Sequence, residues 1–261
     1  MSRLSTSSHR QLSANQLVAH RGLQKGYPEN TALSVRKAID AGARFVEIDI
    51  QLSRDLRPMV YHDIHLARVS GHEGKVSELN CAQLITLPAY EPARLGDQFI
   101  KQTISSLAEV VEIVASHSDV TLFVELKEES IAEFGAEIML NAVCEVLQPI
   151  RDRAVLISFD YQIIAAARTA GWPQVGAVLR KWQHIDSEEI LAIAGDYCFV
   201  DYKMIPGNEN LARLSAILVA YEVGTAELAH QLAERGVAML ETFDINTLLN
   251  QANEENRARD L

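Results

Sequence analysis

The sequence lacks the features that would place it in a membrane or in an oxidising compartment. Its 261 residues include only three cysteines, Cys81, Cys144 and Cys198, which form no C-x-x-C pair. This pattern is typical of reduced thiols in the cytosol and not of a disulfide framework. The longest apolar runs, such as AILVAY at 216–221, are too short to span a bilayer. The N-terminus has no apolar core of a secretory signal, so we predict a cytoplasmic protein without a transmembrane segment.

Basic residues are also in deficit, with 24 Lys and Arg against 35 Asp and Glu and a formal net charge of −11. This balance argues against a surface that binds nucleic acid, which would need a basic patch. An anionic small molecule is still compatible with the composition, because a metal ion or local cations can reverse the field inside a cleft.

Neither a G-x-G-x-x-G loop nor a Walker-type loop occurs, which argues against an open doubly wound sheet. Instead, apolar strand-like runs alternate with segments of helical period, several of which end at a glycine (Gly42, Gly171 and Gly236). The strand-like runs cover 16–20, 44–50, 120–126, 154–159, 174–179, 197–201, 215–221 and 237–241. Eight strands in a chain of this length predict an α/β protein with a closed (β/α)8 TIM barrel.

The predicted domain organisation is simple. Residues 1–15 form a polar N-terminal tail, and 16–261 form a single TIM-barrel catalytic domain. Residues 63–103 break the alternation of strands and helices and contain only one modest helical segment, near 77–87. We interpret them as a small insertion after the second barrel strand region, on the loop side of the barrel.

The second strand carries two carboxylates, Glu47 and Asp49, in its middle. Residues two apart on a strand point to the same face, so these acids repel each other and need a positive partner. One reading is a structural ion pair with Arg44 or another arginine. The other reading is a bound cation.

Polar residues at other strand ends favour the cation. The first strand runs into His20 and Arg21, an extended stretch ends at His62, and the third strand ends with Glu125 and Lys127. The carboxyl ends of barrel strands converge on one mouth, where TIM-barrel active sites lie. Three carboxylates without a cysteine are hard oxygen ligands, which suit a divalent cation such as Mg²⁺ or Ca²⁺.

The remaining side chains suggest a reaction. Arg21 and Lys127 can neutralise anionic oxygens as charge develops in a transition state. Imidazoles change charge near neutral pH, so one of His20 and His62 can remove a proton while the other donates one to the leaving oxygen. Together these groups indicate metal-assisted cleavage of a phosphodiester.

The same stretches resemble the glycerophosphodiester phosphodiesterase family. The resemblance is carried by VAHRG at 18–22, PENT at 28–31, VEIDIQLSRDLRPMVYHD at 46–63 and VELK at 124–127. It implies a TIM barrel with an insertion after the histidine of the third motif and a divalent cation at the active site. The residues implied are Glu47, Asp49 and Glu125 as metal ligands, His20 and His62 as the acid–base pair, and Arg21 and Lys127 as phosphate contacts.

Glu29 matches a family position that supports the site from behind, although an acid there could also interact with the dipole of the first helix. The chain departs from the family pattern at two strand ends. Tyr221 stands where a tryptophan is usual, and Glu241-Thr242-Phe243-Asp244 replaces the more usual Thr-Asp pair. Both departures are expected on the side of the alcohol group of the substrate.

We therefore expect a small-molecule glycerophosphodiester to be hydrolysed to sn-glycerol 3-phosphate and an alcohol. One alternative is lysophospholipase-D-like action on lysophospholipids, for which 81–95 is the only candidate membrane-facing segment. Another is a catalytically silent barrel that binds a phosphorylated metabolite, although such a barrel would be expected to lack one of the two histidines. The sequence does not fix the oligomeric state and leaves a homo-oligomer open.

Overall fold

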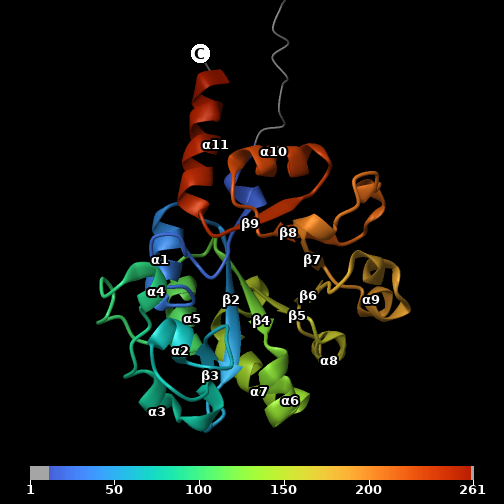
Figure 1. The fold of residues 1–261 in the computed structure, drawn as a ribbon. Coiled ribbons are helices and arrows are strands. Elements are labelled where there is room, and N and C mark those ends of the chain that lie inside the picture. The colour runs from blue at the N-terminus through green and yellow to red at the C-terminus, as the bar shows by residue number, and fades with distance from the viewer. Residues whose placement is uncertain (1–11, 260–261) are drawn as a thin grey trace, which may run out of the picture.

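The computed structural model describes residues 12–259, in which eight parallel strands close into a barrel (Figure 1). β1 pairs with both β2 and β9, and these two pairings complete the ring. The barrel strands are β1 Leu17–Ala19, β2 Phe45–Leu52, β4 Thr121–Leu126, β5 Ala154–Ser158, β6 Gln174–Val178, β7 Tyr197–Asp201, β8 Ile217–Tyr221 and β9 Met239–Thr242. The predicted (β/α)8 TIM barrel is confirmed. Residues 1–11 of the predicted polar tail lie outside the described residues.

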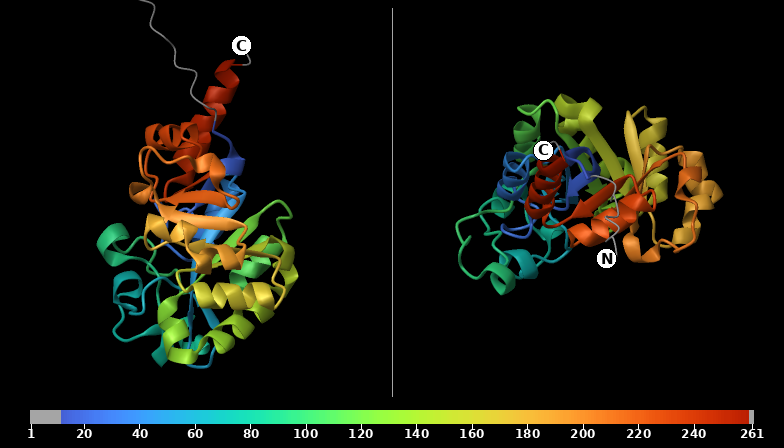
Figure 2. Two further views of the ribbon diagram at one scale, coloured as in Figure 1. Left: turned by 90° about the vertical axis from the view of Figure 1, so that its right-hand side faces the viewer. Right: turned by 90° about the horizontal axis from the view of Figure 1, so that it is seen from above.

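Helices pack around the outside of the strands, as the view from above shows (Figure 2). They are α1 Ala32–Asp40, α5 Leu107–Ala115, α6 Glu128–Phe134, α7 Ala136–Leu147, α8 Tyr161–Thr169, α9 Glu188–Ile193, α10 Ala226–Glu234 and α11 Ile245–Arg259. Side chains of Thr31 and Asp160 cap α1 and α8 by accepting backbone N–H bonds. The glycines predicted to end helices, Gly42, Gly171 and Gly236, all have positive φ, as the left-handed cap requires.

Apolar side chains fill both sides of the barrel wall. Outward-facing strand residues pack under the helices in one large cluster, and inward-facing residues form a separate cluster inside the ring. The buried members of the inner cluster are Val18, Phe123, Val155, Ile157, Val178, Phe199, Val219 and Met239. The rings of Phe123 and Phe199 meet edge to face with centroids 5.1 Å apart. Apolar side chains therefore fill the barrel interior below the carboxyl ends of the strands.

Residues 58–106 leave the barrel between β2 and α5 and form a small layer of their own. β3 (Pro58–Val60) pairs antiparallel with β2, and three short helices follow: α2 Ala67–Ser70, α3 Cys81–Leu84 and α4 Pro92–Leu95. All three lie on one side of the barrel (Figure 1). A separate apolar cluster that includes Met59, Tyr61 and Leu84 holds this layer together. The sequence indicated only the helix near 77–87, because helices of four residues are too short to show a period.

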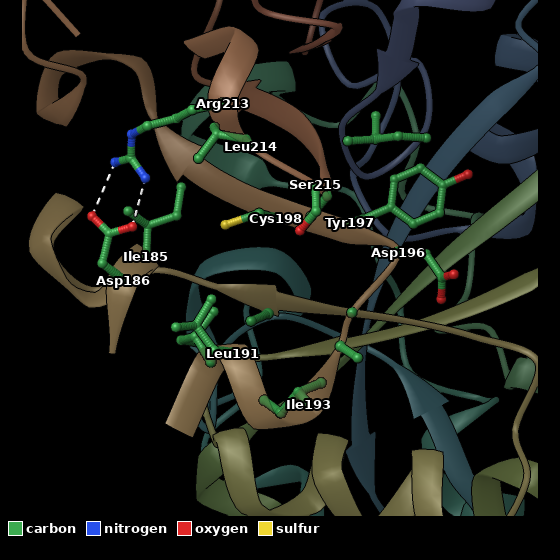
Figure 3. A pocket seen from close by; sticks show the side chains of 16 residues that line it. Ile185, Asp186, Leu191, Ile193, Asp196, Tyr197, Cys198, Arg213, Leu214 and Ser215 are labelled. Atoms are coloured by element: carbon green, nitrogen blue, oxygen red, sulfur yellow. Dashed lines mark hydrogen bonds and ion pairs between the residues drawn. The ribbon is translucent and has the colours of Figure 1, made fainter. Parts of the chain in front are cut away.

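The connection between β7 and β8 contains two short 3₁₀ turns and no α-helix. A cavity of about 520 Å³ opens there, at the amino ends of these two strands (Figure 3). Its rim includes Arg213, which is paired with Asp186 across the opening, and its lining is mostly aliphatic. It lies at the opposite end of the strands from the polar residues predicted to form the site.

The three cysteines, Cys81, Cys144 and Cys198, are free thiols, and the first two are only partly buried. Within residues 12–259, none of the helices combines the length and the apolar character needed to cross a membrane.

Candidate active site

A cavity of about 140 Å³ opens at the carboxyl ends of the barrel strands. Six of the eight residues predicted to form a site line it, while Asp49 and Glu29 are buried directly behind them. The lining residues are His20, Arg21, Glu47, His62, Glu125, Lys127, Ile157, Phe159, Val178, Phe199, Tyr221, Glu222 and Glu241. The polar strand ends therefore do converge on one mouth.

Three carboxylates gather on neighbouring strands at this mouth. Asp49 on β2 stands opposite Glu125 on β4 in the parallel register, and Glu47 lies two residues earlier on the same face of β2. One oxygen from each of the three lies within 4.8 Å of the others. Asn30 fixes Asp49 in place, since its side-chain amide donates to Asp49 Oδ2 at 2.8 Å and its Oδ1 accepts the Asp49 backbone N–H at 3.0 Å.

Two cations interleave with these carboxylates. Arg21 Nε lies 3.1 Å from Asp49 Oδ2, and Lys127 Nζ lies 3.3 Å from Asp49 Oδ1 and 2.8 Å from Glu125 Oε1. Burial favours the neutral form of Asp49, but Arg21 and Lys127 outweigh it and hold the pKa of Asp49 below its usual value. Asp49 is therefore ionised at neutral pH. The alternative partner Arg44 makes no ion pair with either acid of β2 among the described residues.

Glu47 is the carboxylate that these cations leave unsatisfied. Its Oε2 accepts the backbone N–H of Arg21 at 3.1 Å, but its Oε1 is buried and has no hydrogen-bond partner within residues 12–259. Burial first, and then the charges of Asp49, Glu241 and Glu125, raise the pKa of Glu47 well above its usual value. A buried, partnerless oxygen beside two further carboxylates, all of them hard donors, fits a divalent cation at Glu47, Asp49 and Glu125.

The two histidines face the cavity from different elements. His20 follows β1, and burial together with Arg21 lowers its pKa to about 3, so its ring is neutral. Its Nε2 lies 4.0 Å from Glu47 Oε2. His62 follows β3, and its Nδ1 is 2.6 Å from Asp63 Oδ1. With Nδ1 engaged in this way, Nε2 is the ring nitrogen of His62 left for a ligand in the cavity.

Behind the cavity, Glu29 accepts hydrogen bonds from three side chains. Its carboxylate accepts bonds from Arg21 Nη1 at 2.9 Å, from Gln24 Nε2 at 2.7 Å and from both terminal nitrogens of Arg68. Among the described residues, no backbone N–H of α1 donates to it, so its carboxylate serves side chains and not the helix end. Arg68 in turn binds both oxygens of Asp63, at 2.7 and 2.9 Å.

Asp63 and Arg68 were missed as site residues in the sequence analysis. They join His62 to Glu29, and through Glu29 to Arg21, in one chain of charged hydrogen bonds. The adjacent pair His62-Asp63 was a usable signal, because a carboxylate often orients a functional imidazole. The contact between Arg68 and Glu29 spans 39 positions and leaves no trace in local spacing.

The loop after β1 owes its shape to Gly22. A Cβ at this glycine would lie 2.6 Å from Ser34 atoms, and its φ is +78°. The preceding residue, Arg21, also has a positive φ of 53°, and its carbonyl accepts bonds from Ser34 Oγ and the Asn30 backbone N–H. This tight turn aims the Arg21 side chain at Asp49 and Glu29.

A sequence model of the glycerophosphoryl diester phosphodiesterase family matches residues 20–242. The chain belongs to this family.

Relatives agree with this placement. A glycerophosphodiester phosphodiesterase of Bacillus altitudinis is 33% identical over 57% of this chain and 60% of its own length. One from Caldanaerobacter subterraneus is 25% identical over 90% of this chain and 96% of its own. Among solved structures, an Oleispira antarctica phosphodiesterase in complex with the product sn-glycerol-3-phosphate is 24% identical, with a TM-score of 0.79 over 92% of this chain and 96% of that one.

The two departures from the family pattern both lie at the cavity. Tyr221 ends β8 and lines the cavity wall, and Glu241 on β9 reaches into it while only 3% exposed. Burial, followed by the charges of Glu125 and Asp49, raises the pKa of Glu241 well above its usual value. Glu241 was expected near the alcohol group of a substrate and was not among the predicted site residues. A charged residue at a buried strand end was the signal for it.

Proposed function

We propose that this member of the glycerophosphoryl diester phosphodiesterase family hydrolyses glycerophosphodiesters to sn-glycerol 3-phosphate and an alcohol. The observation that carries the proposal is the single small cavity that Glu47, Glu125, Arg21, Lys127 and the two histidines line together. The product complex of the Oleispira antarctica protein, which shares the fold, supports a substrate of this size and charge.

In this proposal Glu47, Asp49 and Glu125 hold a divalent cation, Mg²⁺ or Ca²⁺. When bound, such an ion polarises a phosphoryl oxygen and neutralises charge on it. Seven-coordinate, flexible oxygen sites favour Ca²⁺ and octahedral ones favour Mg²⁺, so the choice depends on how many waters complete the shell.

Arg21 and Lys127 contact the phosphate. Lys127 Nζ donates to Glu125 Oε1 and forms an ion pair with Asp49 Oδ1 at 3.3 Å. Arg21 donates from Nη1 to Glu29, while its Nε lies 3.1 Å from Asp49 Oδ2 as an ion pair. Both cations therefore keep donors for anionic oxygens. Lys127 is buried, Arg21 is partly buried, and both are held by carboxylates before a substrate arrives. A preorganised donor pair of this kind lowers the reorganisation cost of stabilising the transition state.

The two imidazoles divide the proton transfers. His20, whose ring is neutral, accepts a proton from the attacking nucleophile, which is either water or the neighbouring hydroxyl group of the glycerol moiety. In the second case a water molecule then opens the cyclic phosphate, so that either route consumes one water and gives glycerol 3-phosphate. His62 donates from Nε2 to the oxygen of the leaving alcohol, while Asp63 holds its Nδ1 and so sets the plane of the ring. Glu29 and Arg68 support this pair from behind, by fixing Arg21 and Asp63.

A second, wider cavity of about 480 Å³ adjoins the first and shares His20, Arg21 and Glu222 with it. Gln24, Lys25 and Arg94 line it together with Leu95 and Phe243, so it is a polar space with an apolar edge. This lining favours a small polar group over an acyl chain. It therefore supports a soluble diester more than a lysophospholipid. The cytoplasmic location and a homo-oligomeric state stay predictions from the sequence.

The test is release of glycerol 3-phosphate from glycerophosphocholine, glycerophosphoethanolamine and glycerophosphoglycerol, each with Mg²⁺, with Ca²⁺ and with excess chelator. We expect turnover of at least one diester that the chelator stops and that added metal restores. The absence of turnover on all three diesters by folded, metal-supplied protein would contradict the proposal and favour a lysophospholipid substrate or a silent barrel.

A further inference from the structure

His20, Glu47 and Glu241 come together at the cavity from three neighbouring strands, β1, β2 and β9. One potential ligand atom from each lies within 4.8 Å of the other two. This cluster is distinct from the group formed by Glu47, Asp49 and Glu125, and the two share only Glu47. The residues proposed for hydrolysis do not include Glu241, so its burial at this place calls for its own explanation.

Glu241 has no positive partner among the described residues. Arg21 is engaged by Asp49 and Glu29, and Lys127 by Asp49 and Glu125, so neither of the cavity's cations pairs with Glu241. Its Oε1 is buried and lacks a hydrogen-bond partner within residues 12–259, as does Oε1 of Glu47. Two adjacent buried carboxylates, each with an unpartnered oxygen, are costly in the folded state unless a positive ligand binds between them.

The donor set indicates which ligand this is. An imidazole with two carboxylates is a mixed nitrogen–oxygen set, which suits transition-row dications such as Zn²⁺. The neighbouring group offers oxygens alone and suits Mg²⁺ or Ca²⁺. A single Zn²⁺ binds nitrogen and oxygen ligands at about 2.0–2.2 Å, so ligand atoms within 4.8 Å of one another can adjust onto one ion.

We propose that His20, Glu47 and Glu241 form a second cation site, which binds Zn²⁺ or a similar transition dication beside the first site and shares Glu47 with it. Three protein ligands leave a coordination position open toward the cavity, as in zinc sites that keep a water. Tyr221 and Glu222 line the same part of the cavity but are not in the cluster of ligand atoms.

Occupation of this site has a consequence that rests on the proposed function. His20 cannot accept a proton at a nitrogen that already ligates a cation. Zn²⁺ at the second site therefore inhibits a reaction that Mg²⁺ or Ca²⁺ at the first site supports. The chain would respond to metals in two phases, with activation by a hard cation and inhibition by a softer one.

The binding test uses the full chain saturated with Mg²⁺ and dialysed against Zn²⁺, with both metals counted per chain by mass spectrometry. We expect one Zn²⁺ to bind while Mg²⁺ is retained. Glu241→Gln removes a direct ligand, so it should weaken Zn²⁺ binding at least as much as the loss of an outer-shell partner does, about 10- to 100-fold, and leave Mg²⁺ bound. Glu222→Gln is the matched control, because Glu222 lines the cavity outside the cluster, and it should bind Zn²⁺ like the native chain.

A second variant, His20→Asn, guards against a folding defect in Glu241→Gln and should also lose Zn²⁺ while keeping Mg²⁺. Zn²⁺ that replaces Mg²⁺ instead of adding to it, or equal Zn²⁺ binding by the native chain and both ligand variants, would overturn the second site. Neither result depends on turnover, so a failed activity assay on glycerophosphodiesters is distinguishable from a failed metal site. In the activity assay, Zn²⁺ should slow the native enzyme at least 10-fold at saturating Mg²⁺ and have little effect on Glu241→Gln.

Discussion

Arg21 Nε lies 3.1 Å from Asp49 Oδ2, so the side chain proposed to contact phosphate is held by a carboxylate proposed to bind the cation. Glu29 holds the same guanidinium from the other side, at 2.9 Å. Asp49 and Glu29 are buried, Arg21 is partly buried, and the three groups fix one another's positions without a substrate. Changes that release Arg21 should therefore damage catalysis even when they lie outside the cavity.

The turn that carries Arg21 provides the first prediction. Gly22→Ala would place a Cβ 2.6 Å from the backbone and side chain of Ser34, at a φ of +78° that alanine rarely adopts. We expect a loss of stability of about 2 kcal/mol or more and a large loss of kcat, because the turn must move. Gly26→Ala, in the same loop, meets no atom within 4 Å and is the control, with little change expected in a thermal melt or in turnover.

Arg68 provides the second prediction, because it joins Asp63 to Glu29 without lining the cavity. Arg68→Met should lower kcat by about 10-fold or more through misorientation of His62, with little change in metal affinity. The pH dependence of kcat should shift as well, since Asp63 would lose its fixed position. Arg213→Met, which breaks a comparable pair with Asp186 far from the site, should leave both unchanged. An unaltered pH profile in Arg68→Met would mean that Arg68 has only a structural role.

Replacement of Glu47 by Gln should stabilise the metal-free protein and at the same time abolish its activity. The pKa of Glu47 is raised in the folded state by burial and by neighbouring carboxylates, so the metal-free native state disfavours its charged form. Glu47→Gln removes that penalty, which is about 1.4 kcal/mol for each unit of raised pKa, and keeps an acceptor for the Arg21 N–H. In chelator at pH 8, we expect Tm to rise by at least about 2 °C while activity is lost. Glu112→Gln, on an exposed position of α5, should not change Tm.

The same raised pKa fixes a pH dependence for the metal-free protein. Above the unfolded-state pKa of about 4.3, native Glu47 holds its proton while unfolded Glu47 loses it. The native state then binds more protons than the unfolded state, so stability falls as pH rises through this window. Glu241, whose pKa is also raised, acts in the same direction. Denaturant melts in chelator should show the decline, and a saturating divalent cation should reduce it; a decline unchanged by metal would argue against ligation by Glu47.

Much of the fold could be predicted from sequence, because each barrel strand is a short apolar run that is buried on both faces. The carboxylates of β2 and β4 could be paired for the same reason: a strand of known direction fixes the face and the end at which Glu47, Asp49 and Glu125 lie. Because the carboxyl ends of barrel strands converge at one mouth, His20 and Lys127 could be predicted to lie beside these carboxylates. Each of these predictions depends only on the regular geometry of strands and barrels.

Arg68 and Glu241 could not be predicted as site residues, because regular strand or barrel geometry does not determine the contacts that place them there. The pairing of Arg68 with Glu29 joins α2, a four-residue helix in the layer formed by residues 58–106, to the loop after β1. Four strands, β5 to β8, separate Glu241 from the last predicted site residue in sequence, Lys127. Only closure of the ring through β1 and β9 brings Glu241 beside His20. Closure is a property of the whole chain, so local spacing does not reveal that neighbour.

The proposed function requires that Glu47, Asp49 and Glu125 hold the cation that hydrolysis needs. Calorimetric titration of Mg²⁺ and of Ca²⁺ into the native chain, Asp49→Asn and Glu125→Gln tests this claim, with turnover of the best diester measured on the same samples. We predict that each variant loses high-affinity binding of the activating cation and that turnover falls on the order of 10³-fold, with the fold intact by circular dichroism. Native binding and turnover in either folded variant would contradict the claim.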